Sequence, residues 1–171
     1  MPDQLRIRKA IPSDIKVLRA FIFEHGVNEW NFLPKDGVTA HLNAIATGEV
    51  QGLLAEKQSK LAGYVTFYRS TKMSRYQPAA EAGTPHGYIA EAVVHRDYTG
   101  QGIGTLLMKS TVEDLWGQGF AEIYVERHEE NRSSAGIMRK AGFVEIDLFH
   151  DPERRSYGSR RTSVSRLRRT G

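Results

Sequence analysis

A short glycine-rich segment, residues 99–105, has the residue types and spacing to bind a phosphate group. Gly100, Gly102 and Gly104 stand at alternate positions directly before an amphipathic helical pattern. Residues without a Cβ atom let the chain turn sharply and let a ligand approach the backbone. Successive N–H groups at the positive end of a helix then form a concave site for a phosphate or pyrophosphate.

Other phosphate-binding motifs fit this segment less well. A P-loop requires Gly-Lys-Ser/Thr, and the sequence contains no Gly-Lys pair. In a dinucleotide-binding fingerprint the third glycine comes three residues after the second, whereas here it comes two residues after it. A purely structural glycine turn is the remaining alternative.

Two glutamates on the neighbouring predicted strands are candidates for proton transfer. Glu91 interrupts the apolar run of residues 88–94, where a charge is costly unless it is paired or used. Glu126 ends the next predicted strand, residues 120–126. For each glutamate the alternative is a structural ion pair with an arginine, or a solvated strand end.

The elements that would position these residues follow from the hydrophobic pattern. A first helix is expected to begin at Ser13, as its N-cap, and to end at Gly26. Strand, glycine turn, helix and strand within residues 88–126 form a βαβ unit, whose two strands should be parallel with a right-handed crossover. The predicted strands cover residues 5–9, 52–56, 61–68, 88–94, 120–126, 143–149 and 162–167, and the later helices cover 38–46, 104–116 and 133–141.

Two signatures in this order resemble the GNAT superfamily of N-acetyltransferases. Residues 94–107 are similar to its acetyl-CoA pyrophosphate loop. The stretch Asn131–Ala135, followed by Lys140–Phe143, resembles its second signature, in which Asn opens a helix and Gly-Phe closes it. The likeness is strong over residues 88–144, only architectural over 5–67, and fades after residue 151.

The resemblance implies an α/β (α+β) fold in a single GNAT-like domain. Its centre would be a mixed, mostly antiparallel, twisted sheet of about seven strands, flanked by about four helices. One parallel βαβ unit would be splayed to hold acetyl-CoA. Residues 1–150 would form the N-acetyltransferase domain, and residues 151–171 an Arg-rich C-terminal segment with a last strand and a flexible tail.

The resemblance also implies which residues bind the cosubstrate, acetyl-CoA. The backbone of Ala92, Val93 and Val94 should pair with the pantetheine arm like an added strand, and the side chain of Asn131 should reach the pantetheine. The pyrophosphate should lie against the loop residues Thr99, Gly100, Gln101, Gly102, Ile103, Gly104 and Thr105.

Two positions depart from the family pattern. The loop usually begins with Arg or Gln, and Thr99 stands there instead, which removes a charge. The helix after Asn131 often carries a Tyr, thought to protonate the departing thiolate, where this chain has Met138. Methionine cannot donate a proton, so another group or water does so, or the thiolate leaves unassisted.

Acetyl transfer to an amine requires the neutral amine, and an alkylamine with a pKa of about 10.4 is almost fully protonated at pH 7. Glu91 or Glu126 could accept that proton, directly or through water. Without cysteine or a Gly-x-Ser-x-Gly motif, direct attack in a ternary complex is expected. Backbone N–H groups near Val93 and Val94 would stabilise the acetyl oxygen.

Composition and charge limit the cellular location and the binding partners that we expect. Neither a signal peptide nor a membrane-length apolar run is visible, so a cytoplasmic protein is expected. The six histidines lack metal-ligand spacing and are interpreted as surface or loop residues, so no metal is expected. The net charge of +4 resides in the seven arginines of residues 151–171. The acceptor should be an amine of a small molecule or a protein, and a homodimer is compatible with the family.

Two alternatives to an enzyme remain open. A non-catalytic acyl-CoA-binding regulatory protein is compatible with Met138. A nucleic-acid-associated module could use the Arg-rich segment, but that segment matches no recognition motif and contains a single aromatic residue, so a nucleic-acid partner is not expected. By resemblance, four aromatic residues border the acceptor site, although core packing is the alternative for most of them: Trp30, Phe32, Tyr68 and Tyr76.

Overall fold

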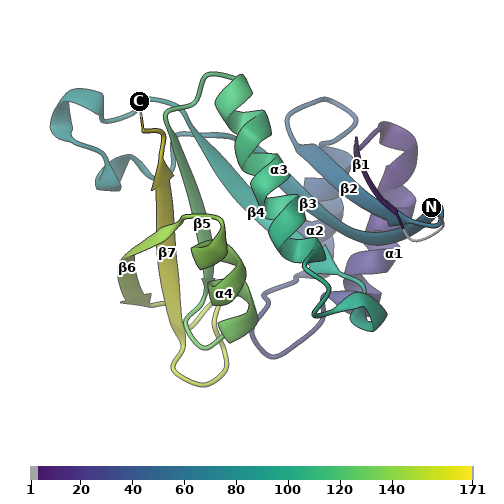
Figure 1. Ribbon diagram of the computed structural model, residues 1–171. Coiled ribbons are helices and arrows are strands. Elements are labelled where there is room, and N and C mark those ends of the chain that lie inside the picture. Colours follow the sequence, from purple (N-terminus) through teal and green to yellow (C-terminus); the bar gives the residue numbers. More distant parts are fainter. Residues whose placement is uncertain (1–3, 171) are drawn as a thin grey trace.

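A mixed sheet of seven strands, in the order β1-β2-β3-β4-β5-β7-β6, runs through the computed structural model, which describes residues 4–170 (Figure 1). Within it only β4 and β5 pair in parallel, and all other neighbours are antiparallel. The outer ends of the predicted ranges 1–150 and 151–171, residues 1–3 and 171, lie outside the described residues. The strands are β1 (Leu5–Lys9), β2 (Gln51–Lys57), β3 (Lys60–Ser70), β4 (His86–Val94), β5 (Glu122–His128), β6 (Val144–His150) and β7 (Arg161–Arg168).

Four α-helices cover the two faces of this sheet. Helices α1 (Ile15–His25) and α2 (Lys35–Asn43) pack on one face, and α3 (Ile103–Gly117) and α4 (Arg132–Lys140) lie on the other (Figure 1). The sheet, the single parallel pair and the four helices confirm the predicted fold class. Among residues 4–170, no helix combines the length and the apolar character needed to cross a membrane.

Each face has its own hydrophobic core. Leu107 and Leu115 of α3 are fully buried against the sheet on one side, and Leu18 of α1 and Leu42 of α2 are fully buried on the other. Burying one leucine side chain contributes roughly 2 kcal/mol. The layers therefore hold the central strands β3 and β4 in place from both sides.

The first helix begins differently from the prediction. Ser13 is not its N-cap, because Pro12–Asp14 form a 3₁₀ turn and α1 starts only at Ile15. Asp14 accepts the N–H of Ile11 at 2.8 Å and binds the Arg8 guanidinium with both carboxylate oxygens. Because Asp14 has this charged partner on β1, Asp14 and not Ser13 fixes the start of the helix.

The second helix is also shifted from its predicted range, 38–46. It spans Lys35–Asn43, follows the extended residue Pro34, and includes Gly37. The predicted boundary at Gly37 therefore lies inside the helix, which buried Val38 and Leu42 anchor in the core.

A tight turn joins β2 and β3, and the last predicted strand is present. Gln58 and Ser59 both have positive φ, 53° and 64°, as a two-residue hairpin turn between β2 and β3 requires. The predicted last strand is β7, and it lies between β5 and β6. The Arg-rich segment thus contributes a strand, β7, to the interior of the sheet.

Candidate active site

The parallel strands β4 and β5 separate after a short paired region. Their register covers only Gly87–Ile89 against Ile123–Val125. Beyond these residues a cavity of about 350 Å³ opens between the strands. Residues 90–94 of β4 and residues 125–127 of β5 line it, together with parts of α2, α3, α4 and two loops.

The free edge of β4 presents backbone groups to this cavity. The N–H of His95 donates to Ala62 O on the β3 side, at 2.8 Å. Because successive residues of an antiparallel strand direct their polar groups to opposite sides, Val93 also bonds toward β3, whereas Ala92 and Val94 face the opening. The structure therefore places two of the three predicted backbone residues, Ala92 and Val94, where an extended amide-bearing arm could pair.

A β-bulge in β4 decides where Glu91 points. Thr66 pairs with Glu91 and the next residue, Phe67, pairs with Ile89, which leaves Ala90 without a partner on β3. Because Ala90 is an extra residue in β4, side chains before and after it that would share one face of a regular strand point to opposite faces. Ile89 packs under α3, whereas Val93 packs in the core beneath α1 and α2.

Glu91 consequently lies on the α1 and α2 side of the sheet, in a nearly buried position that lines the cavity. Its side chain is 12% exposed and accepts the Tyr64 hydroxyl at 3.0 Å. Burial raises the pKa of Glu91 to about 7, although hydrogen bonds from Tyr64 and Thr66 oppose this. A carboxyl group with this pKa can gain and lose a proton near neutral pH.

His41 of α2 also lines the cavity beside Glu91. Its Nε2 lies 2.8 Å from Thr66 Oγ1 and 3.8 Å from Glu91 Oε1. Burial lowers the pKa of His41, so the ring is neutral at pH 7. The interpretation of all histidines as surface or loop residues was therefore wrong for His41, and also for His86 and His128, which are buried strand residues.

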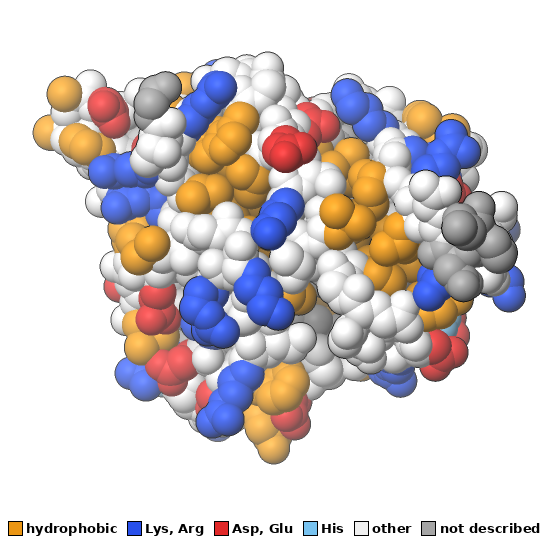
Figure 2. All heavy atoms as spheres, viewed as in Figure 1, with side chains coloured by type: hydrophobic (Ala, Val, Ile, Leu, Met, Phe, Trp, Pro, Cys, Tyr) orange, Lys and Arg blue, Asp and Glu red, His pale blue; other side chains and the backbone are white. Residues whose placement is uncertain are grey.

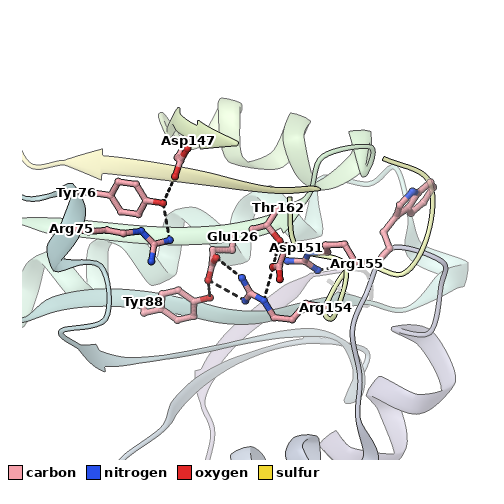
Figure 3. Close-up of polar contacts among 10 residues, drawn as sticks. Arg75, Tyr76, Tyr88, Glu126, Asp147, Asp151, Arg154, Arg155 and Thr162 are labelled. Carbon is pink, nitrogen blue, oxygen red and sulfur yellow. Dashed lines mark hydrogen bonds and ion pairs between the residues drawn. The ribbon is translucent and has the colours of Figure 1, made fainter. Parts of the chain in front are cut away.

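Glu126, the second predicted carboxylate, faces the same cavity from β5 in a different environment (Figure 3). It accepts the Tyr88 hydroxyl at 2.6 Å and pairs with Arg154 at 2.9 Å. Arg154 also binds Asp151, at 2.8 Å. Burial favours a raised pKa for Glu126, but the hydrogen bonds from Arg154 and Tyr88 outweigh it and lower the pKa. Glu126 is therefore ionised and held in place.

The glycine loop opens α3 at the cavity's other end. Gly100 and Gly102 have φ of 81° and 82°, in the left-handed region that favours glycine. The amide groups of the first helical turn, starting at Ile103, have no acceptor inside the helix. The hydroxyl of Thr99 donates to Arg96 O at 2.8 Å, so this side chain fixes the loop's own backbone.

Asn131 and Met138 both lie in the cavity wall. Asn131 caps α4 through its Oδ1, which accepts the Ser134 N–H at 3.2 Å. Its Nδ2 has no hydrogen-bond partner among residues 4–170. Met138 is 6% exposed and lines the cavity. Its thioether provides an apolar wall there.

Arg154 and Arg155 line the cavity from the β6–β7 loop, and neither is among the predicted site residues. Both belong to the Arg-rich C-terminal segment, where nothing in the local pattern separates a site residue from a solvated one. Of the aromatic residues expected at the acceptor site, Phe32 lines the cavity, whereas Trp30, Tyr68 and Tyr76 lie outside its lining. Residues 4–170 contain no group of three or more His, Asp or Glu side chains placed to hold a metal ion.

Comparison with known proteins agrees with this arrangement. N-alpha-acetyltransferase 30 from Schizosaccharomyces pombe is 32% identical over 60 residues, which are 35% of this chain and 40% of that protein. The structure of NAA60 from Arabidopsis thaliana in complex with acetyl-CoA superposes with a TM-score of 0.75 at 15% identity, over 98% of this chain and 100% of that one. A Bacillus subtilis acetyltransferase in complex with CoA gives 0.72 at 16% identity, over 98% and 100%.

The family assignment rests on the sequence match. The model described as the acetyltransferase (GNAT) family matches residues 19–143, which is most of the chain and includes β4, the glycine loop, α3 and α4. The structural likenesses extend the shared fold over nearly the whole chain. The chain therefore belongs to the acetyltransferase (GNAT) family.

Proposed function

We propose that this protein transfers the acetyl group of acetyl-CoA to a primary amine by direct attack in a ternary complex. One observation carries the proposal: the free backbone edge of β4 and the buried carboxylate of Glu91 line the same cavity. The edge can hold the thioester arm, and the carboxylate can accept the proton of the amine. Carboxyl groups with a pKa raised by burial cluster at catalytic sites, which favours an enzyme over a binding protein without catalysis.

The donor would lie along β4, with its pyrophosphate against the glycine loop. Ala92 and Val94 would pair with the pantetheine arm, and the amides of the predicted loop residues would bind the phosphates. The free Nδ2 of Asn131 would donate to the arm. Lys and Arg side chains gather over α3 and α4 on this face, where Lys109, Arg132, Arg139 and Lys140 are exposed (Figure 2), and their charge would favour the approach of a polyanion.

Glu91 is the general base of this proposal. With a pKa of about 7, it is ionised in a substantial fraction of molecules at neutral pH and takes the proton of the bound ammonium group. The nitrogen then attacks the thioester carbon, and the N–H of Val94 stabilises the negative charge on the oxygen. Collapse of the tetrahedral intermediate breaks the C–S bond and expels the thiolate, while the nitrogen releases its second proton to water. Because Met138 cannot protonate it, the thiolate takes its proton from water.

Glu126 would help to orient the acceptor amine through its position and its negative charge. Since Arg154 and Tyr88 hold it ionised, it is a weaker proton acceptor than Glu91, but its charge can orient the ammonium group before transfer. The acceptor amine could belong to a small molecule or to a protein. Relatives of both kinds share the fold, such as the ribosomal-protein-S18-alanine N-acetyltransferase from Escherichia coli and a mosquito arylalkylamine N-acetyltransferase-like protein.

The test is release of CoA thiol from acetyl-CoA with a panel of amines: amino acids, peptides, polyamines and arylalkylamines. We expect turnover with at least one class, and a loss of roughly 100-fold or more in kcat for Glu91→Gln. Glu113→Gln, at an exposed position of α3, is the matched control and should retain wild-type turnover. Full activity of Glu91→Gln would exclude Glu91 as the base.

A further inference from the structure

Arg155 is a buried guanidinium group in the wall of the cavity, and it has no ionic partner of its own. The residue is 8% exposed and lies in the β6–β7 loop. Its Nε donates to Thr162 Oγ1 at 2.9 Å, and its Nη1 donates to the backbone oxygen of Trp30 at 3.2 Å (Figure 3). Its Nη2 has no hydrogen-bond partner within residues 4–170. Nor does any described carboxylate lie within ion-pair distance.

The neighbouring arginine takes up the carboxylates that could have served Arg155. Arg154 binds Glu126 at 2.9 Å and Asp151 at 2.8 Å, and Asp151 also accepts the Thr162 hydroxyl at 2.7 Å. Burial and the neighbouring charge of Arg154 lower the pKa of Arg155, whereas the charges of Glu126 and Asp151 oppose this. Arginine stays charged in proteins, so Arg155 remains a cation. A buried cation without a direct counter-ion is costly, and an anionic ligand would remove that cost.

Among the ionisable side chains that line the cavity, the guanidinium groups outnumber the carboxylates. Two carboxylates, Glu91 and Glu126, face three guanidinium groups, those of Arg127, Arg154 and Arg155. Glu91 is partly protonated near pH 7, because its pKa is about 7. Arg127 donates to the backbone oxygens of His128 and Glu129 and lies 3.7 Å from Glu145. With Asp151 beside Arg154 and Glu145 beside Arg127, Arg155 is the guanidinium group of this cavity that has no carboxylate within 4 Å among residues 4–170. A ligand that carries an anion would supply one.

We propose that the acceptor is an amine that also carries a carboxylate, and that Arg155 binds this carboxylate while the amine reaches Glu91. The proposal builds on the acetyl transfer described above and names its substrate class. A planar guanidinium group with a free Nη2 matches the geometry of a carboxylate. Arg155 would thus be a specificity-determining residue. Its bonds to Thr162 on β7 and to Trp30 in the α1–α2 loop hold the group in place.

The first test compares each amino acid with its carboxamide, which keeps the amine and masks the carboxylate. The common L-amino acids and their carboxamides are assayed by CoA release, with putrescine as a cationic acceptor. Ala-Asp and Ala-Asn separate a side-chain carboxylate from an α-carboxylate. We expect the preferred acid to exceed its amide by roughly 10- to 100-fold in kcat/KM, mainly through KM, because charged hydrogen bonds are strong. Equal values for acids and amides would overturn the proposal.

The second test separates carboxylate recognition from a structural role of Arg155. Arg155→Gln should lose the preference for the acid while its kcat/KM for the amide changes little, and Arg155→Lys should keep part of the preference. Arg161→Gln is the matched control, because Arg161 pairs with Glu129 outside the cavity and its side chain is 47% exposed. An equal loss for acid and amide in Arg155→Gln would mean that the residue only braces the loops. Unchanged acetyl-CoA affinity by calorimetry shows that the variant is folded.

A binding measurement makes this proposal independent of turnover. Amino acids and their carboxamides are titrated calorimetrically into the protein saturated with CoA. Preferential binding of the acids, lost in Arg155→Gln, would support the carboxylate site even if no amine were acetylated, in which case the proposed transfer itself would be wrong. Turnover of amines without any preference for acids, in assays and in titrations, would leave the transfer intact and exclude the carboxylate site.

Discussion

At the scale of single residues, the raised pKa of Glu91 predicts how the reaction depends on pH. A general base must be deprotonated to act, so kcat/KM should rise with pH up to about 7 and then level off. Glu91→Gln should lose this step together with most of its activity. The measurement is the pH profile of CoA release between pH 5 and 9 with an acceptor in limiting concentration. If the wild-type profile shows no change of slope near pH 7, Glu91 is not the general base.

Met138 gives a second prediction at this scale. Its thioether lines the cavity but cannot donate a proton, so its role is limited to packing. Met138→Leu preserves volume and polarity, and its kcat should stay within about threefold of wild type. Steady-state kinetics at saturating acetyl-CoA check this outcome. A loss of a hundredfold or more would show that the sulfur takes part in the reaction.

At the scale of elements, the glycine loop can be tested with a control of the same backbone conformation. Gly102 and Gly48 both have φ of 82°, and a Cβ at either position would meet no atom within 4 Å. Aspartate at either site therefore brings a similar backbone strain, about 1–2 kcal/mol. Only Gly102→Asp also places a negative charge where the phosphates of acetyl-CoA would bind.

We therefore expect Gly102→Asp and Gly48→Asp to lose similar stability in urea unfolding, whereas only Gly102→Asp loses acetyl-CoA affinity, by roughly tenfold or more. Calorimetric titration with acetyl-CoA and with CoA measures this difference. Similar affinities for the two variants would remove the glycine loop from the binding site.

The helices and strands also show which features of the fold can be predicted from the sequence. Apart from the start of α1 and the range of α2, the predicted strands and helices agree with the structure to within a few residues, because local periodicity and turn residues determine them. The glycine loop and the Asn131 cap are local motifs. The bulge at Ala90 is not visible in the sequence, since it arises from pairing with β3. For the same reason the partners of Glu91, His41 on α2 and Tyr64 on β3, could not be inferred. Arg155 lies at the cavity only because the loop between β6 and β7 passes there.

At the scale of the whole molecule, Glu91 links the site to the stability of the fold. Burial raises its pKa from 4.5 to about 7 in the folded protein. Between these two pH values the unfolded chain releases the proton while the folded protein retains it, so this group lowers the free energy of unfolding as pH rises. Above pH 7 the loss is complete, and below pH 4.5 it is absent.

Glu91→Gln removes this titration, so the variant should gain stability relative to wild type as pH rises from 4.5 to 8. The expected gain is on the order of 2 kcal/mol, because one unit of pKa corresponds to about 1.4 kcal/mol and the site retains some contact with solvent. Urea unfolding of both proteins at several pH values measures it, with Glu113→Gln as a control whose difference from wild type should stay constant. A pH-independent difference for Glu91→Gln would mean that the carboxyl group is not held protonated by burial. A gain in stability together with the loss of turnover would show that the fold bears the cost of the buried base that the reaction needs.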